Sequence, residues 1–233
     1  MRANSSGRLW AILTTMTGLA TLIISIAFSR LPAVRTARAC MTHGDVIRFE
    51  LARSVESLTA IFGPAAAPCR GLVIAAMDAI NHFDIAAFIP TYSAFAVSSA
   101  VWLVGRLLTP LTLIAIAAAL VAFGADLIET ITLLEMTNDL STADSLALVA
   151  SAAAWTKFTA LTVHALVLSA ACLVVTPRRW GLSLLLLAPL VGTSVAISDV
   201  ARQAHMLSLG LGVAWGALVL TALREALRRR RPA

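Results

Sequence analysis

Long apolar runs separated by short polar segments dominate the chain. Windows of about 20 residues predict membrane-spanning helices, because this length crosses the hydrocarbon layer of a bilayer. The third and fourth runs exceed that length, so tilted or protruding helices are expected, and the fifth run is the shortest. The fold class predicted is all-α, a polytopic transmembrane bundle forming a single integral membrane domain, 1–233. The six predicted spans cover residues 9–28, 86–105, 107–134, 147–175, 182–197 and 206–223.

Composition supports lipid as the solvent of this chain. Hydrophobic residues make up 59% of it and charged residues 13%, against about 45–50% and 25% in ordinary soluble domains. The net charge is +6, but the basic residues stand at the ends of apolar runs instead of on one soluble face. We therefore predict no nucleic-acid partner. The chain has no glycine-rich phosphate loop, Gly-x-Ser-x-Gly elbow or His-Glu-x-x-His motif, so no cofactor is predicted.

Arginine placement predicts the orientation of the bundle. With the amino terminus inside, the cytoplasmic segments hold ten arginines against one acid, and the outer segments hold seven against nine. This bias predicts a multi-pass protein of the cell membrane, typical of a bacterial inner membrane, with both termini cytoplasmic. The first apolar run is longer than that of a signal peptide, which favours a retained helix. The arginines of 228–231 are interpreted as an anchor to anionic headgroups.

Residues 30–83 form the one sizeable polar segment, which is predicted to be extracytoplasmic or interfacial and helical. Apolar residues recur in it at helical spacing through Gly63, which predicts one amphipathic helix on the membrane surface or over the mouth of the bundle. A second helical stretch begins near Cys69 and runs into the second span. The apolar face of the first helix consists of Ile47, Leu51, Val55, Leu58 and Phe62.

Cys40 and Cys69 flank the amphipathic helix on the side predicted to face an oxidising compartment. A disulfide and two unpaired thiols fit the sequence equally, because the pattern does not supply the distance between the two residues. Cys172 has apolar neighbours and is interpreted as a small packed residue.

Lys157 is the most informative residue, because it stands alone in a long apolar run. An ammonium at that depth costs at least ~2.5 kcal/mol and nearly always has a partner. Asp126 and Glu129 share one face of the preceding helix, at a compatible depth. Two carboxylates and one ammonium leave a surplus negative charge, so either Arg53 supplies a second cation or one carboxyl group keeps its proton. Alternatively, the ion pair serves only to hold two helices together.

Two polar stripes extend this cluster in the sequence. His164 lies two turns from Lys157 on one helix face, and Asp84, Thr91 and Ser98 repeat every seven residues on the second span, with Tyr92 beside them. Polar faces of membrane helices point inward, so we expect a polar cavity open to the outer side. These residues include no paired histidines or cysteine set, so no metal site is predicted. The small residues Ser208, Gly212 and Gly216 predict close helix packing.

Four short segments of the chain stand out: Phe49-Glu-x-Ala-Arg53, Phe83-Asp-x5-Pro90-x-Tyr92-Ser93, Ala125-Asp-x-x-Glu129 and Lys157-Phe158. They resemble those of a loosely defined family of small, uncharacterised bacterial polytopic membrane proteins. The resemblance covers about residues 45–160 and departs from the family pattern at Thr130, where asparagine is usual. It implies the same fold and implies that Asp84, Tyr92, Asp126, Glu129 and Lys157 act together, but it supplies no substrate.

Three functions fit these observations. The first is an integral membrane protein whose buried charged pocket, in the outer half of the bundle, binds or transports a small or lipid-like ligand, with proton exchange at Asp126 and Glu129. The second is an intramembrane enzyme acting on a lipid or isoprenoid, with one of these carboxyl groups as general acid and Asp84 as its partner. The third is a structural or accessory membrane subunit. The lipid bilayer is the one partner that the sequence predicts directly.

Overall fold

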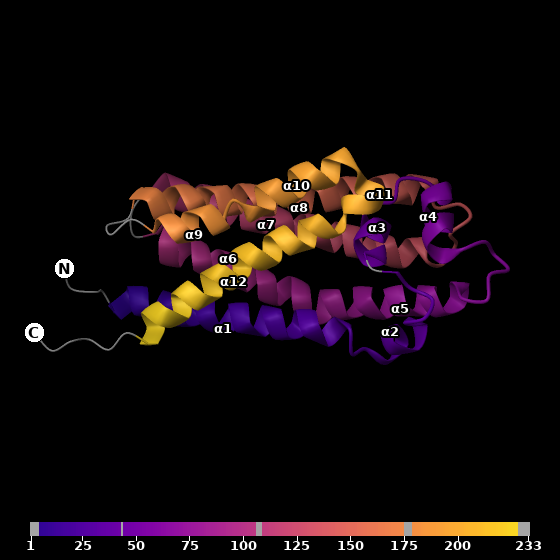
Figure 1. The fold of residues 1–233 in the computed structure, drawn as a ribbon, viewed down its shortest axis with the longest axis horizontal. Coiled ribbons are helices and arrows are strands. Elements are labelled where there is room, and N and C mark those ends of the chain that lie inside the picture. Colours follow the sequence, from indigo (N-terminus) through magenta and orange to yellow (C-terminus); the bar gives the residue numbers. More distant parts are fainter. Residues whose placement is uncertain (1–4, 43, 106–108, 175–178, 228–233) are drawn as a thin grey trace, which may run out of the picture.

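The computed structural model describes residues 5–42, 44–105, 109–174 and 179–227. The arginine-rich segment 228–231 and three further arginines used for the orientation, Arg2, Arg106 and Arg178, lie outside the described residues. Within those ranges the chain is a bundle of helices without a strand. The beginning of α1 (Ser5–Phe28) and the end of α12 (His205–Leu227) lie at the same end of the bundle (Figure 1).

The prediction of an all-helical polytopic bundle is confirmed. Among the described residues, six helical segments are long and apolar enough to cross a membrane, and each overlaps one of the six predicted spans. The most extensive contact between spans is that of α7 (Thr109–Met136) with α8 (Asp144–Val174), which pack as an antiparallel hairpin. Besides α1 and α12, the elements are α2 (Pro32–Ala37), α3 (Asp45–Glu50), α4 (Val55–Phe62), α5 (Arg70–Phe83), η1 (Asp84–Phe88), α6 (Ile89–Leu103), α7 (Thr109–Met136), α8 (Asp144–Val174), α9 (Trp180–Leu185), α10 (Ala188–Ser198) and α11 (Val200–Gln203).

The second span begins earlier than predicted, because α5, η1 and α6 form one continuous helical rod from Arg70 to Leu103. The π-helical turn η1 precedes Pro90, and the Ile89 N–H bonds the Asp84 carbonyl five residues back. Pro90 has no N–H to donate, and the wider turn accommodates this interruption. One extra residue in a turn rotates the following side chains by about 100°. Asp84 therefore does not share one straight face with Thr91 and Ser98.

The end of the bundle opposite the termini carries a small helical structure that we call the head. It consists of α2, α3 and α4 together with the adjoining ends of α5, α7 and α8 (Figure 1). Phe49, Leu58 and Phe62 from α3 and α4 are buried there against α5, α7 and α8. The head thus has an apolar core of its own. The parts of α5, α7 and α8 that contribute to this core extend beyond the length that a bilayer requires.

The prediction of a single amphipathic helix up to Gly63 is wrong. The chain forms two helices, α3 and α4, and residues 51–54 between them are not helical; we call these residues the 51–54 break. Ser54 is extended (φ −156°, ψ 160°) and its hydroxyl accepts a hydrogen bond from the Ser57 N–H, which caps α4. Two distant side chains bond the backbone of the break: the Ser151 hydroxyl donates to the Leu51 carbonyl, and the Val55 N–H donates to the Asp144 carboxylate. The break ends α3 at Glu50.

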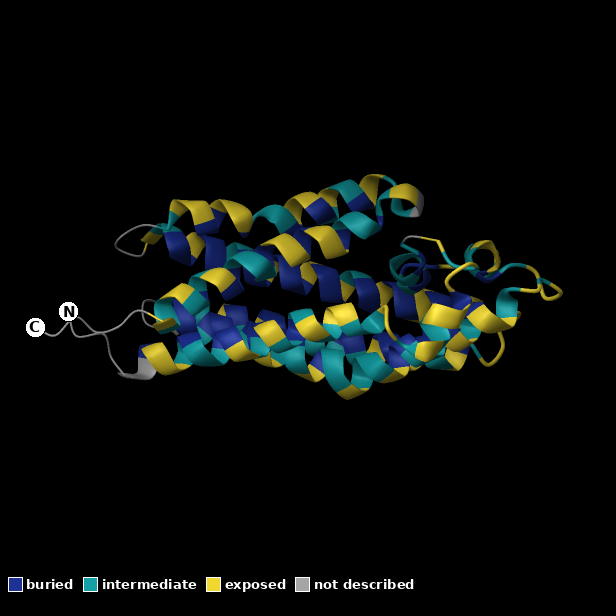
Figure 2. Ribbon diagram, turned by 60° about the horizontal axis from the view of Figure 1, so that its bottom comes forward, coloured by how far each residue is buried: buried dark blue, intermediate teal, exposed yellow. Residues whose placement is uncertain are grey.

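Apolar side chains cover the outside of the spans as well as their interior. Figure 2 shows buried positions on the inward sides of the helices and exposed ones on the outward sides. Met16, Ile23, Leu113, Leu184 and Leu220 are all exposed on the bundle surface. An apolar surface of this extent on a helical bundle is stable in lipid and not in water.

Close packing between α10 and α12 depends on Gly192 and Gly210, not on the predicted ridge. A Cβ at Gly210 would lie 2.6 Å from the Ala188 carbonyl oxygen, whereas a Cβ at Gly212 would meet no atom within 4 Å. Gly216 is equally open, and Ser208 is exposed. The prediction of close packing at Ser208, Gly212 and Gly216 is therefore wrong. The sequence pattern found the right helix but the wrong face.

Gly210→Ala is expected to lower the free energy of unfolding by about 1–3 kcal/mol, because the backbone of α10 must move away from α12. Gly212→Ala, two residues along the same helix, is expected to be neutral or stabilising by up to about 1 kcal/mol, since alanine favours the helix. Thermal unfolding in neutral detergent measures both. Equal effects of the two substitutions would contradict the close approach at Gly210.

Candidate functional site

Lys157 is buried and contacts three carboxylates. Its Nζ lies 3.0 Å from Asp126 Oδ1, 2.8 Å from Glu129 Oε2 and 3.1 Å from Glu50 Oε2. The ammonium donates hydrogen bonds to all three groups. We call these four residues the Lys157 cluster. The predicted meeting of Lys157 with Asp126 and Glu129 is present in the structure.

Helix geometry explains how α7 and α8 bring these groups together. Asp126 and Glu129 stand three residues apart and so project from one face of α7, and that face packs against α8, which carries Lys157. Asp126 is 2% exposed and Glu129 1%. At this burial, electrostatic attraction between the charged groups is stronger than at a protein surface.

Glu50 is the site residue that the sequence reasoning missed. The hydrophobic pattern predicted that Glu50 lies on a surface helix, and Glu50 was therefore included among the acids of the outer segments. Because α3 ends at Glu50, its side chain turns into the bundle, where it is 12% exposed. Burial raises the pKa of Glu50 above its usual value of 4.5, although the Lys157 ammonium opposes the rise. The signal that could have found Glu50 is its place in the Phe49-Glu-x-Ala-Arg53 segment, one of the four segments that stand out in the sequence.

The depth of the cluster follows from its position along the spans. Asp84, Glu129 and Lys157 each lie 17–20 residues from the end of their span that is nearer the termini. At about 1.5 Å per residue this is about 26–30 Å, close to the ~30 Å thickness of the hydrocarbon layer. The cluster therefore stands where a bilayer around the spans would end on the head side. Glu50, which belongs to the head, covers the cluster on the head side.

Asp84 and Tyr92 lie beside the cluster without contacting the ammonium. Asp84 Oδ2 accepts a hydrogen bond of 3.4 Å from the Thr130 hydroxyl on α7, while its Oδ1 is buried without a hydrogen-bond partner among the described residues. Tyr92 is buried, and its hydroxyl donates to the Ala122 carbonyl, one turn before Asp126. Asp84 thus adds a fourth carboxyl group to the surroundings of one ammonium.

His164 belongs to a different part of the bundle from the Lys157 cluster. Its Nδ1 lies 3.0 Å from the Ala115 carbonyl oxygen, and its Nε2 lies 3.3 Å from the Ser99 hydroxyl. The ring is buried and joins α8 to α6 and α7 about 10 Å from Lys157 along the helix. These contacts are those of a hydrogen-bonded histidine in the interior of the bundle.

The residues of the second polar stripe have separate hydrogen-bond partners. The Thr91 hydroxyl bonds the Ala87 carbonyl of its own helix, and the Ser98 hydroxyl lies 3.3 Å from the Thr17 hydroxyl on α1. The turn at η1 rotates Asp84 away from both, as described above. A cavity does exist near the cluster, but other residues line it.

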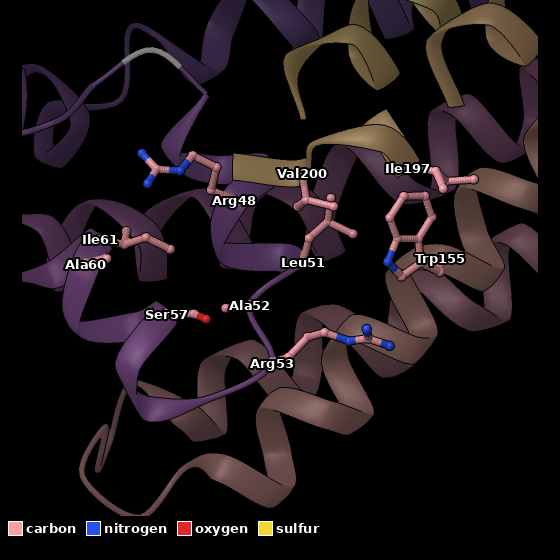
Figure 3. A pocket seen from close by; sticks show the side chains of 10 residues that line it. All are labelled: Arg48, Leu51, Ala52, Arg53, Ser57, Ala60, Ile61, Trp155, Ile197 and Val200. Carbon is pink, nitrogen blue, oxygen red and sulfur yellow. The ribbon is translucent and has the colours of Figure 1, made fainter. Parts of the chain in front are cut away.

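This cavity lies between the head and the spans and has a volume of about 510 Å³. Figure 3 shows the Arg53 side chain extended along it, with Trp155 and Ile197 toward the same side of the view and Arg48 at the opposite one. Arg53 forms no ion pair with the Lys157 cluster and is exposed, so it does not act as the second cation considered for the cluster. The residues that line the cavity are Arg48, Leu51, Ala52, Arg53, Ser57, Ala60, Ile61, Trp155, Ile197 and Val200.

The cysteines of the head are joined, which decides between the two alternatives that the sequence left open. Cys40 and Cys69 form a disulfide with a Cα–Cα distance of 5.6 Å, within the usual range. The bridge ties the loop after α2 to the beginning of α5 and encloses α3 and α4. Cys172 is a free, buried thiol in the apolar core.

Within the described ranges, no group of three or more histidine, cysteine, aspartate or glutamate residues is arranged to hold a metal ion. In the Lys157 cluster the ammonium occupies the centre of the carboxylate group instead. The geometry of the site is thus one cation surrounded by more acid groups than it can neutralise. Comparisons with protein families, with curated proteins and with solved structures find no match to this chain, so its function has to be inferred from this geometry.

Proposed function

We propose that this integral membrane protein binds or transports a small or lipid-like ligand at the head side of the bundle, and that the Lys157 cluster exchanges protons in the process. The observation that carries the proposal is the contact of one ammonium with three carboxylates. The orientation predicted from the arginines places the head, and with it the ligand entrance, outside the cytoplasm.

Charge balance is the physical reason for proton exchange. If Glu50, Asp126 and Glu129 were all ionised, the cluster would carry a net charge of −2 at the edge of the hydrocarbon layer, and Asp84 would add another. Burial of uncompensated charge costs several kcal/mol per ion, and carboxyl groups avoid this cost by binding protons. The cluster therefore holds protons that can leave when a cation, a ligand or water changes the balance.

Glu50 is suited to link this balance to a ligand. It is the one cluster member that comes from the head and not from a spanning helix, and it is also the most exposed carboxylate of the three. Leu51, the next residue, lines the cavity. A ligand that moves the 51–54 break would therefore move Glu50 relative to Lys157.

The two alternative functions fit this geometry less well. An intramembrane enzyme of the kind considered needs a carboxyl group facing an apolar cleft, whereas no carboxylate lines the cavity beside the cluster. A purely structural ion pair between α7 and α8 needs one acid for one ammonium, and it gives no reason for the inward turn of Glu50. Binding with proton exchange accounts for both observations.

The proton content of the cluster is measured by infrared spectroscopy of the reconstituted protein during a pH titration. We expect the carbonyl band of protonated carboxyl groups to persist well above the pH range of about 4 in which exposed Asp and Glu ionise. Glu50→Gln and Glu129→Gln are each expected to remove part of this band. Glu56→Gln is the matched control, because Glu56 is an exposed acid of the neighbouring helix α4.

A variant in which Asp126 and Lys157 exchange their charges distinguishes the proposal from a purely structural role. The double variant Asp126→Lys with Lys157→Asp keeps one cation against the same number of acids and is expected to restore folding relative to either single variant. It is also expected to shift the midpoint of the carboxyl band, because the proton sites have moved. The proposal fails if no protonated band exists at neutral pH, or if none of the cluster substitutions alters it.

A further inference from the structure

The cavity beside the cluster combines an unpaired cation with an apolar wall. Arg53 is exposed and forms no hydrogen bond or ion pair with any residue that the structure describes. Arg48, the other basic residue of the lining, is already 3.1 Å from Asp45 Oδ1. Arg53 is thus the group of this cavity that is available to an anion. A guanidinium is suited to phosphate or carboxylate, which it binds through two parallel hydrogen bonds.

The remaining lining is suited to a hydrocarbon chain. Leu51, Ile61 and Val200 supply aliphatic surface, and Trp155 supplies an indole. Ile197 at the end of α10 is 64% exposed, so the cavity borders the apolar outer surface of the bundle. At the depth derived above, Trp155 stands at the boundary of the hydrocarbon layer, where tryptophan is common in membrane proteins.

From these observations we infer that the cavity binds an amphiphilic anion, with its phosphate or carboxylate headgroup on Arg53 and its chain along Trp155 and Ile197 toward the bilayer. The inference rests on the proposed function and names the class of its ligand. The volume of about 510 Å³ lies within the range of small-molecule sites. It accommodates a headgroup and the first part of a chain, while the rest of the chain remains in lipid.

The same geometry explains how such a ligand would reach the cluster. Arg53 lies in the 51–54 break, three residues after Glu50, and Trp155 lies two residues before Lys157 on α8. An anion that draws Arg53 toward Trp155 pulls on the backbone that holds Glu50 against the ammonium. Ligand binding and proton binding are then coupled through one short segment.

The test uses the full chain in phosphatidylcholine nanodiscs, titrated with dodecyl phosphate. Trp155 fluorescence, taken as the difference from Trp155→Phe, and the adducts seen by native mass spectrometry report binding. We expect saturable binding that Arg53→Gln weakens by about tenfold to a hundredfold, as for the loss of a charged hydrogen bond. Arg35→Gln is the matched control, because Arg35 is an exposed arginine of the head that does not line the cavity; its binding should equal that of the wild type.

Inorganic phosphate and uncharged dodecanol separate the headgroup from the chain, and both are expected to bind at least about tenfold more weakly than dodecyl phosphate. Equal binding of either compound overturns the amphiphile, and unchanged binding in Arg53→Gln overturns the site. The infrared titration of Arg53→Gln verifies that the variant retains the folded cluster. If dodecyl phosphate fails while the protonated carboxyl band is present, the ligand class is wrong and the proton-exchanging cluster stands.

Discussion

Replacing Lys157 by methionine is expected to lower the free energy of unfolding by about 3–5 kcal/mol, the range found when one partner of a buried ion pair is removed. The physical cause is the set of three carboxylates that would lose the ammonium now 2.8–3.1 Å away. Methionine keeps much of the length and volume of the lysine stem, so loss of packing contributes little. Denaturant or thermal unfolding in neutral detergent measures the change.

A second substitution shows that charge, not packing, causes this loss. Adding Asp126→Asn to Lys157→Met is expected to recover part of the stability, because one fewer acid is left without a cation, and the two changes are then non-additive. Arg202→Met is the matched control, since the Arg202 side chain is 85% exposed, and its effect should stay within about 0.5 kcal/mol. Additive effects of Lys157→Met and Asp126→Asn would contradict an electrostatic cluster.

Removing the disulfide is expected to destabilise the head by about 3–4 kcal/mol. Cys40 and Cys69 close a loop with a sequence separation of 29, and the chain entropy regained by an open loop of this length corresponds to that free energy. Because α3 and α4 lie inside the loop, the loss should be local to the head and leave the spans folded. Hydrogen exchange of residues 41–68 should therefore accelerate in Cys40→Ala with Cys69→Ala, while exchange within α7 and α8 stays slow.

Reductant provides the control for this prediction. Treating the wild-type protein with reductant should accelerate exchange in 41–68 to the rate of the double variant, whereas the variant itself should not respond. Cys172 is buried in the core and away from the head, so Cys172→Ala should keep the full response to reductant. Equal protection of the oxidised and reduced head would show that packing of Phe49, Leu58 and Phe62 is sufficient to hold it.

Much of this architecture could be predicted from the sequence. Hydrocarbon imposes a length of about 20 apolar residues on every span, so each of the six spans can be predicted without knowledge of the helices around it. The contact of Lys157 with Asp126 and Glu129 was also predictable, because helical periodicity places both acids on one face and a short connection aligns α7 with α8 in depth. Both results depend on local regularities of helices in lipid.

What the sequence could not show depends on contacts between distant residues. The break between α3 and α4 uses the Ser151 hydroxyl and the Asp144 carboxylate, which lie 100 and 89 residues from their backbone partners. Without that break the periodicity indicates one surface helix, and Glu50 is assigned to solvent.

The sequence by itself therefore determined the spans, their charged residues and the pairing within one hairpin. Only the tertiary structure decided that the head inserts Glu50 above the ammonium, that the packed glycine of α12 is Gly210, and that Cys40 meets Cys69. The physical reason is that lipid dictates the length and face of a helix locally, whereas the path of a polar segment is set by the hydrogen bonds and contacts it finds elsewhere in the fold.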